Sequence, residues 1–219
     1  MGNNFEIKYS VKVKKIITGR LKQNCYLVSR NKLLIIIDPG SNATEIVNEI
    51  NKHNLIPLAI LNTHAHFDHI GAIDYLKNKY SIPFYLHSND NRLLRSANLY
   101  QLVFKGDGSI IIPSVDIYFD DNNLNYNIGN IKFSFLHTPG HTNGSVCIKI
   151  NNNLFTGDTL MKNVIGRSDL PGGNKNKLID SLMKIKDLPN KLNIYPGHGK
   201  KSILGDEIST INNYIKINP

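Results

Sequence analysis

The chain of 219 residues carries 26 Lys and Arg against 17 Asp and Glu, a formal net charge of +9, and 41% of its residues are hydrophobic. This length favours a single domain, residues 1–219, with a substantial core. No apolar run approaches the ~20 residues of a membrane span, and Met1 to Glu6 lacks the pattern of an export signal. We therefore expect a soluble, cytoplasmic protein without a membrane partner.

The positive charge raises nucleic acid as a partner. However, 21 of the basic residues are Lys and 5 are Arg, and they are scattered along a chain that also holds 30 Asn. This composition indicates a coding bias toward AT-rich codons and solvated lysine faces. We expect a small-molecule substrate and no nucleic-acid partner, with the positive field favouring an anionic substrate.

The predicted elements alternate between the two kinds of secondary structure. Alternation of apolar and polar residues predicts strands, and apolar residues at helical spacing predict helices; Ser41 or Asn42 can cap the first helix. The predicted strands cover 7–17, 24–30, 33–37, 57–62, 83–86, 115–119, 124–128, 131–137, 145–150, 153–156 and, last, 192–195, and the helices 43–53, 69–80, 89–104, 175–187 and 205–216. This order predicts an α/β protein with two sheets packed face to face and helices outside.

Residues 89–113 carry no chemical signal. Cys25 and Cys147 lie in apolar, strand-like runs, which indicates buried thiols in a reducing compartment; a single bridge between them is the alternative. His53 and His87 are expected on the surface, and His137 is expected to stabilise a loop.

The richest cluster of potential metal ligands is Thr63-His64-Ala65-His66-Phe67-Asp68-His69, directly after an apolar run. His64 and His66 are two residues apart, so their side chains share one side of an extended segment and can hold one ion. Asp68 and His69 follow where the chain turns and can face a second ion. Imidazole and carboxylate together suit zinc, iron or manganese better than calcium.

Three later segments place further donors at strand ends, beside Gly or Pro. They are His137-Thr138-Pro139-Gly140-His141-Thr142, Phe155-Thr156-Gly157-Asp158-Thr159 and Tyr195-Pro196-Gly197-His198-Gly199. Each is a weak motif alone, because a strand-end His or Asp is more often a turn former. Together with the first cluster they provide seven donors.

The seven donors divide between two ions. His64, His66 and His141 form one group, Asp68, His69 and His198 form the other, and Asp158 can bridge them because a carboxylate has two oxygens. Each ion then keeps a position for solvent, as catalytic sites do. The two carboxylates, Asp68 and Asp158, are the predicted catalytic residues.

These motifs resemble those of the metallo-β-lactamase-fold superfamily, and within it the short bacterial glyoxalase II-like (hydroxyacylglutathione hydrolase-like) hydrolases. The matching segments are Asn24-Cys25-Tyr26-Leu27-Val28, Asp38-Pro39-Gly40, Thr63–His69, Thr138–Thr142, Gly157-Asp158-Thr159-Leu160, Gly166–Gly173 and Tyr195–Gly199. The resemblance implies an αββα sandwich of two mixed sheets with two divalent metal ions, zinc first and iron or manganese as alternatives. It also implies hydrolysis of an acyl thioester such as S-D-lactoylglutathione by a metal-bridging hydroxide.

The chain departs from the two-domain members of this family after His198. Only 21 residues follow it, so we expect no C-terminal helical domain for glutathione. Arg167 stands where those enzymes carry a lysine that contacts glutathione, which makes Arg167 a candidate substrate-binding residue; the alternative is a salt bridge to Asp169. Asp38 is expected to order the site loops and to hydrogen-bond a ligand histidine.

Other functions remain open at this point. A mononuclear iron persulfide dioxygenase shares the His motifs, and a metal-dependent nuclease of the same fold would fit the positive charge. β-Lactam hydrolysis is less favoured because the common zinc enzymes carry Cys at the position of Asp158. A non-catalytic metal-binding protein is the remaining alternative.

Overall fold

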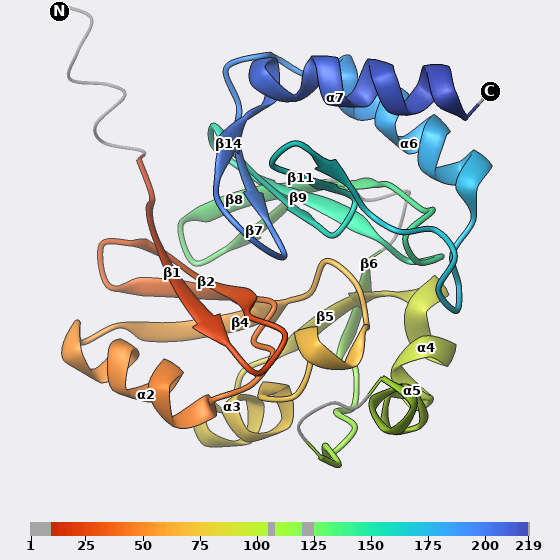
Figure 1. Ribbon diagram of the computed structural model, residues 1–219. Helices are drawn as coiled ribbons and strands as arrows, with labels where there is room; N and C mark the ends of the chain where they lie inside the picture. The colour runs from red at the N-terminus through yellow and green to blue at the C-terminus, as the bar shows by residue number, and fades with distance from the viewer. Residues whose placement is uncertain (1–9, 105–107, 120–124, 219) are drawn as a thin grey trace, which may run out of the picture.

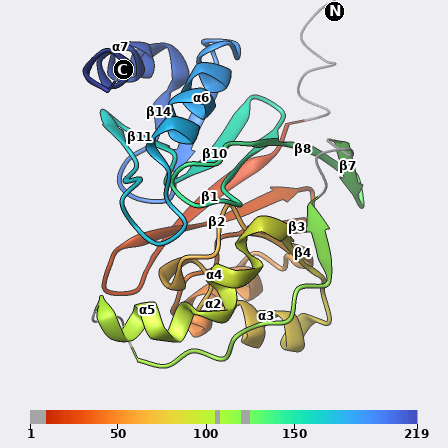
Figure 2. The ribbon, with the colours of Figure 1, turned by 90° about the vertical axis from the view of Figure 1, so that its right-hand side faces the viewer.

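The chain folds into layers in the order helices, sheet, sheet, helices (Figure 1). The computed structural model describes residues 10–104, 108–119 and 125–218. Within these residues the structure has two six-stranded sheets and a separate two-stranded one. A view at right angles to the first shows one helix layer outside each large sheet (Figure 2). The predicted αββα sandwich is therefore confirmed.

The first sheet has the strand order β1-β2-β3-β4-β5-β6. β1, β2 and β3 pair antiparallel, whereas β4, β5 and β6 are added in parallel. The strands are β1 (Lys12–Thr18), β2 (Gln23–Arg30), β3 (Leu33–Ile37), β4 (Ile56–Leu61), β5 (Phe84–His87) and β6 (Ile117–Phe119); the helices on its outer side are α2 (Ala43–Lys52), α3 (Ile73–Tyr80), α4 (Asn91–Arg95) and α5 (Ala97–Val103), with the 3-10 turns η1 (Phe67–His69) and η2 (Ser88–Asp90).

The second sheet has the order β14-β13-β10-β9-β8-β7. It is also mixed, because β10 and β13 run parallel while the other neighbours are antiparallel. Its strands are β7 (Asn125–Ile128), β8 (Ile131–His137), β9 (Val146–Ile150), β10 (Asn153–Gly157), β13 (Asn193–Pro196) and β14 (Ser202–Ile203); α6 (Lys175–Lys186) and α7 (Leu204–Ile217) cover it, and β11 (Leu160–Met161) and β12 (Val164–Ile165) form the small sheet.

Alternating side chains of the strands fill separate cores. In β2, Cys25 and Leu27 face the helices beside the first sheet, whereas Tyr26 and Val28 face the other sheet. A further core lies between the second sheet and α6 and α7. The central strands are thus buried on two faces, which explains why β3 and β4 are almost continuously apolar, whereas the edge strands β1 and β7 keep exposed residues. Cys25 and Cys147 are buried free thiols, as expected.

The structure departs from the sequence prediction at several points. Asn42 is the N-cap of α2, but its side chain makes no capping hydrogen bond because its backbone is left-handed. The helix predicted over 89–104 is interrupted at Ser96. The last strand is β14, which with two residues is too short to leave a pattern. Residues 7–9 and 124 of the predicted strands, and 105–107 of the stretch 89–113, lie outside the described residues.

Within the part of the chain that the structure describes, no helix is both long and apolar enough to cross a membrane.

The core between the sheets generates a test of the packing. Phe155 is fully buried and its ring lies 5.3 Å from that of Tyr26 and 5.1 Å from that of Tyr195. We expect Phe155→Ala to lower the free energy of unfolding by about 3–5 kcal/mol, because it removes transfer energy and leaves a cavity. Urea titration measures this. Tyr75→Ala, at a side chain that is 52% exposed on α3, is the matched control, with an expected change within about 0.5 kcal/mol.

Candidate metal centre

Four segments bring all seven predicted donors together. His64, His66, Asp68 and His69 come from the loop after β4 and from η1, His141 follows β8, Asp158 follows β10 and His198 follows β13. Each segment continues a strand of the sandwich. Strand ends far apart in the sequence therefore deliver the donors to one place.

The first group consists of His64, His66 and His141. The Nδ1 atom of His66 lies 3.1 Å from Nε2 of His64 and 2.9 Å from Nε2 of His141. Two nitrogens ~2.0–2.1 Å from one zinc ion at tetrahedral angles would lie about 3.3–3.4 Å apart. The three imidazoles are therefore spaced as ligands of a single ion.

The second group consists of Asp68, His69 and His198. Oδ2 of Asp68 is 3.2 Å from Nε2 of His198 and 3.8 Å from Nε2 of His69. The potential ligand atoms of each group lie within 4.8 Å of one another, and Asp38, His64 and His69 meet the same criterion. Asp38 is engaged elsewhere, as shown below.

Asp158 lies between the two groups. Its Oδ2 atom is 3.6 Å from Nε2 of His141 and 3.5 Å from Nε2 of His198, and its Oδ1 atom is 3.6 Å from Nε2 of His69. Oδ1 of Asp158 and Nε2 of His69 are buried without a hydrogen-bond partner. Buried polar atoms are rarely left unpaired. Their position facing the other donors fits the coordination of a cation, and the cluster as a whole fits a dimetal site.

The ring nitrogens that point away from the cluster form hydrogen bonds, and these fix the orientation of the histidine rings. Nδ1–H of His141 donates to the Arg167 carbonyl at 2.7 Å, and Nδ1–H of His198 donates to the Leu21 carbonyl at 3.1 Å. This tautomer leaves the Nε2 lone pair of each ring directed at the cluster. Ligand histidines in metal proteins are held in the same way.

Asp38 holds two further rings, those of His64 and His69, through one carboxylate. Its Oδ2 atom accepts from Nδ1–H of His69 at 3.0 Å and from the Thr63 hydroxyl at 2.6 Å, and its Oδ1 atom accepts from the Thr63 amide at 2.7 Å. Since that hydroxyl proton is committed to Asp38, the Thr63 oxygen is free to accept from Nδ1–H of His64 at 3.1 Å. The hydrogen bonds expected for Asp38 are thus present, and they reach one histidine of each group.

The loop that carries His198 is joined to β2 of the other sheet. The Asn24 amide donates to the Gly197 carbonyl at 2.7 Å, and the Tyr26 hydroxyl donates to the Pro196 carbonyl at 2.6 Å. A Cβ atom at Gly197 would lie 2.1 Å from Oδ1 of Asp158. Only glycine therefore allows this loop to approach the cluster.

Asp90 is a buried residue of the site that no sequence motif indicated. Its Oδ2 atom accepts from the Ala65 amide at 2.9 Å and from the Thr142 hydroxyl at 2.8 Å, and its Oδ1 atom accepts from the Gly144 amide. Burial raises the pKa of Asp90, and the three donors oppose that rise. Asp90 ties the His64–His66 segment to the segment of His141.

His87 is the residue whose environment was predicted wrongly. It is 3% exposed, and its ring stacks on that of His137 with centroids 4.0 Å apart. It lies at the end of β5, where the other sheet covers it. His137 hydrogen-bonds the Asn143 carbonyl at 2.9 Å and so stabilises a loop, as expected.

Burial and charge separate the histidines into two kinds. Burial, reinforced by the neighbouring imidazoles, lowers the pKa of His64 well below its ordinary value and that of His66 to about 3, so both rings are neutral, as metal ligands must be. Burial also acts on His69, but the Asp68 and Asp158 carboxylates outweigh it and raise its pKa to about 9. The Asp68 and Asp158 carboxylates therefore favour a positive charge at the second group.

A cavity of about 280 Å³ opens onto the cluster. Donors form part of its surface and apolar side chains form the rest; its lining residues are Leu21, His66, Phe67, Asp68, Tyr100, Phe104, His141, Asp158, Arg167, Leu170, Pro171 and His198. Tyr100 and Phe104 belong to the stretch that carried no signal in the sequence. The Arg167 guanidinium donates to both carboxylate oxygens of Asp169, at 2.9 and 2.8 Å.

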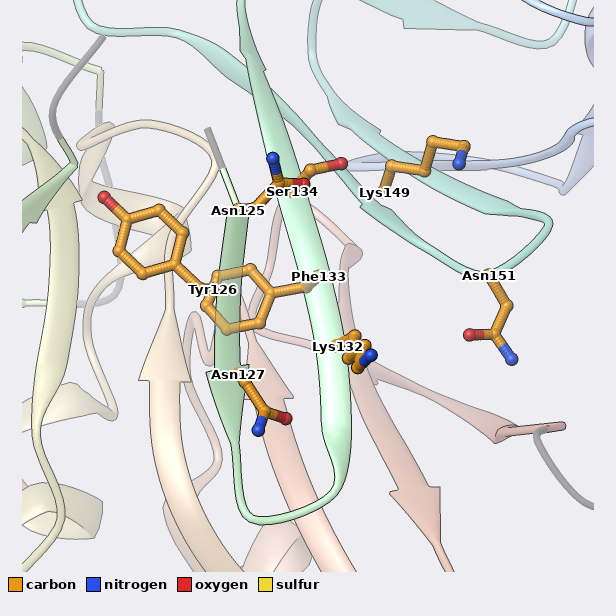
Figure 3. Close-up of a pocket in the computed structure, with 8 residues that line it drawn as sticks. All are labelled: Asn125, Tyr126, Asn127, Lys132, Phe133, Ser134, Lys149 and Asn151. Carbon is orange, nitrogen blue, oxygen red and sulfur yellow. The ribbon is translucent and has the colours of Figure 1, made fainter. Parts of the chain in front are cut away.

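A larger cavity of about 500 Å³ lies over β7, β8 and β9 and shares no lining residue with the first. Figure 3 shows the rings of Tyr126 and Phe133 against each other in it, with Lys132 and Lys149 nearby. Its described lining residues include no His, Cys, Asp or Glu. Of these two cavities, the smaller one is bordered by the predicted donors.

The donor groups predict a metal stoichiometry. We expect the desalted protein to retain two zinc ions per chain and His198→Ala to retain one, because the second group loses a ligand. Elemental analysis measures this. His53→Ala, at an exposed His outside the cluster, should retain two. Zinc at 100 times its dissociation constant should raise the free energy of unfolding by ~2.7 kcal/mol per site.

The position of Asp90 predicts a second effect on metal binding. In Asp90→Asn, the side-chain NH₂ group faces one of the N–H or O–H groups that donate to the carboxylate, so that hydrogen bond is lost. We expect zinc affinity to fall on the order of 10- to 100-fold and the apo protein to lose about 1–3 kcal/mol. Chelator competition and urea unfolding measure the two effects. Asp187→Asn, at an exposed position, should change neither; unchanged zinc affinity in Asp90→Asn would contradict the assigned role.

Comparisons with known proteins agree with this geometry. The probable metallo-hydrolase YqgX of Bacillus subtilis is 37% identical over 88% of this chain and 92% of its own length. The hydroxyacylglutathione hydrolase GloC of Haemophilus influenzae is 31% identical over 85% and 90%.

Two solved structures have the same fold. The B3 metallo-beta-lactamase BLEG-1 superposes with a TM-score of 0.82 at 36% identity, over 90% of this chain and 97% of that one. TTHA1623, in a di-iron-bound form, gives 0.83 at 35% identity, over 90% and 98%. The family model of the metallo-beta-lactamase superfamily matches residues 18–198. The chain therefore belongs to the metallo-beta-lactamase superfamily and is of the metallo-hydrolase type.

Proposed function

We propose that the protein is a dimetal hydrolase of acyl thioesters, with S-D-lactoylglutathione as the first substrate to test. The observation that carries the proposal is the Asp158 carboxylate, whose oxygens lie within 3.6 Å of nitrogens of both donor groups at the base of a cavity. Similarity to GloC supports the thioester as substrate class.

The reaction needs a water nucleophile. The described residues that line the cavity include no Ser, Thr, Cys or Lys that could attack a carbonyl. When bound, two divalent ions would lower the pKa of a water between them and polarise the acyl carbonyl. Zinc suits the donor set, and iron and manganese are alternatives; the di-iron form of TTHA1623 supports iron in particular.

The side chains then have separate tasks. Asp68 and Asp158 face the cavity and can accept the proton that the attacking water loses. The new C–O bond forms as the C–S bond breaks, and the products are a carboxylate and a thiol. A thiol has a pKa of ~8.5, so the departing thiolate needs no strong acid. The five imidazoles, with the Asp68 and Asp158 carboxylates, would hold the ions, and Asp38 and Asp90 hold the imidazole-bearing loops.

β-Lactam hydrolysis is the second candidate, because the chain is 36% identical to the B3 metallo-beta-lactamase BLEG-1. This reaction uses the same water nucleophile. The C–N bond of the lactam breaks, and the amine stays covalently attached to the acyl group through the rest of the molecule. The absence of cysteine from the donor groups therefore does not decide between the two reactions.

A direct assay separates these candidates. We expect protein loaded with two zinc, iron or manganese ions per chain to release glutathione from S-D-lactoylglutathione, a chelator to abolish release, and two equivalents of metal to restore it. A cephalosporin assayed in parallel should react at least 100-fold more slowly. Faster cephalosporin hydrolysis, or oxygen consumption with a persulfide at one iron per chain, would reject the thioesterase proposal.

A further inference from the structure

One side of the metal-site cavity is apolar. Apart from η1, the segments that form this side carry no metal donor. This side consists of Leu21 from the β1–β2 loop, Phe67 from η1, Tyr100 and Phe104 at α5, and Leu170 and Pro171 before α6. We call these six residues the apolar wall. Tyr100 also packs against the core of the first sheet, so the wall is anchored to the body of the protein.

Two members of the apolar wall are large and poorly covered. Leu21 is 44% exposed and Phe104 is 43% exposed. Single exposed apolar residues need no explanation, but these two border the same cavity as the donors. Exposed apolar surface beside a polar site is typical of a ligand-binding surface.

The Arg167 guanidinium is paired with Asp169 in an exposed ion pair. Its side chain forms a two-pronged ion pair with Asp169, a geometry in which both carboxylate oxygens are engaged. Apart from imidazoles, Arg167 is the sole cationic side chain among the described residues of the cavity. The carboxylates of a glutathione conjugate must therefore compete with Asp169 for the one guanidinium in this lining.

We propose that the apolar wall binds an uncharged hydrocarbon acyl group, so that the preferred substrates are thioesters of short to medium aliphatic acids. This inference rests on the proposed thioester hydrolysis and names its substrate class. The acyl arm fits the wall better than the thiol arm, because the departing sulfur gains negative charge and an apolar surface would destabilise it. The hydrocarbon of the acyl arm stays uncharged throughout.

The size of the cavity sets a limit on this arm. At about 280 Å³ it lies below the ~300–1,000 Å³ of cavities that enclose drug-sized ligands. It can enclose one arm of a thioester but not a whole tripeptide conjugate. The thiol arm must then extend toward solvent, where its identity matters less.

The test is a series of thioesters of N-acetylcysteamine, an uncharged thiol, with acetyl, butyryl and hexanoyl groups, assayed on the metal-loaded protein beside S-D-lactoylglutathione. We expect kcat/KM to rise on the order of fourfold per added methylene until the cavity is filled. The hexanoyl ester should exceed S-D-lactoylglutathione by at least tenfold. Equal rates along the series, or preference for the glutathione conjugate, would overturn the inference and leave thioester hydrolysis standing.

Substitutions in α5 and at Phe104, which follows it, test whether the apolar wall causes the dependence of kcat/KM on acyl chain length. Phe104→Ala should lower kcat/KM for the hexanoyl ester on the order of tenfold and for the acetyl ester less than twofold, at unchanged metal content. Leu102→Ala is the matched control, because Leu102 is 78% exposed and does not line the cavity. Asp169→Asn, which frees Arg167, should raise kcat/KM for S-D-lactoylglutathione and not for the hexanoyl ester. A loss with Leu102→Ala as large as with Phe104→Ala would overturn the inference.

A binding measurement separates the two proposals. The non-hydrolysable ketone in which a methylene replaces the sulfur of the hexanoyl ester should bind the metal-loaded protein in calorimetry, and Phe104→Ala should weaken it several-fold. Binding without turnover of any thioester would reject the proposed function and support the apolar wall as an acyl site. Neither binding nor turnover would reject both.

Discussion

The buried Asp38 carboxylate is the constraint on which the metal centre depends. It is 1% exposed and holds His69 directly and His64 through the Thr63 hydroxyl. Burying a charge is costly unless it is fully hydrogen-bonded, and three donors compensate it here. Asp38 also has a positive φ of 49°, which is unfavourable for a residue other than Gly. Such strain persists where the surrounding structure fixes it, commonly at functional sites.

The same constraint couples the centre to the fold. Asp38 directly follows β3, and the residues it holds directly follow β4, its parallel neighbour. The contacts of Asn24 and Tyr26 with the His198 loop then join the two sheets at this edge. Since Nδ1 of His64, His69, His141 and His198 each hydrogen-bonds a group outside the cluster, none of these four rings can rotate without breaking a hydrogen bond. The sandwich thus orients these four rings before any ion binds.

The convergence of the seven donors could be predicted from the sequence, because few residue types bind metals and each donor segment follows a strand. The central strands could be predicted as well, since two buried faces make them almost continuously apolar, and β1 could be predicted from its alternation. Asp90 could not be predicted, because its partners are two backbone amides and a hydroxyl from distant loops. His87 was missed for a related reason: burial by the opposite sheet leaves no local pattern. β14 has two residues and its pairing with β13 depends on tertiary structure alone.

The apolar wall was invisible in the sequence for a different reason. Its Leu, Phe, Tyr and Pro side chains are of the same types that fill any core, and only their position beside the donors distinguishes them. Leu21 and Phe104 are also partly exposed, so their replacement costs little stability, typically within about 0.5 kcal/mol. Four donor histidines are fixed by hydrogen bonds, whereas Leu21 and Phe104 of the wall can be replaced at little cost in stability. Proteins named for different substrates, such as BLEG-1 and GloC, are accordingly 36% and 31% identical to this chain.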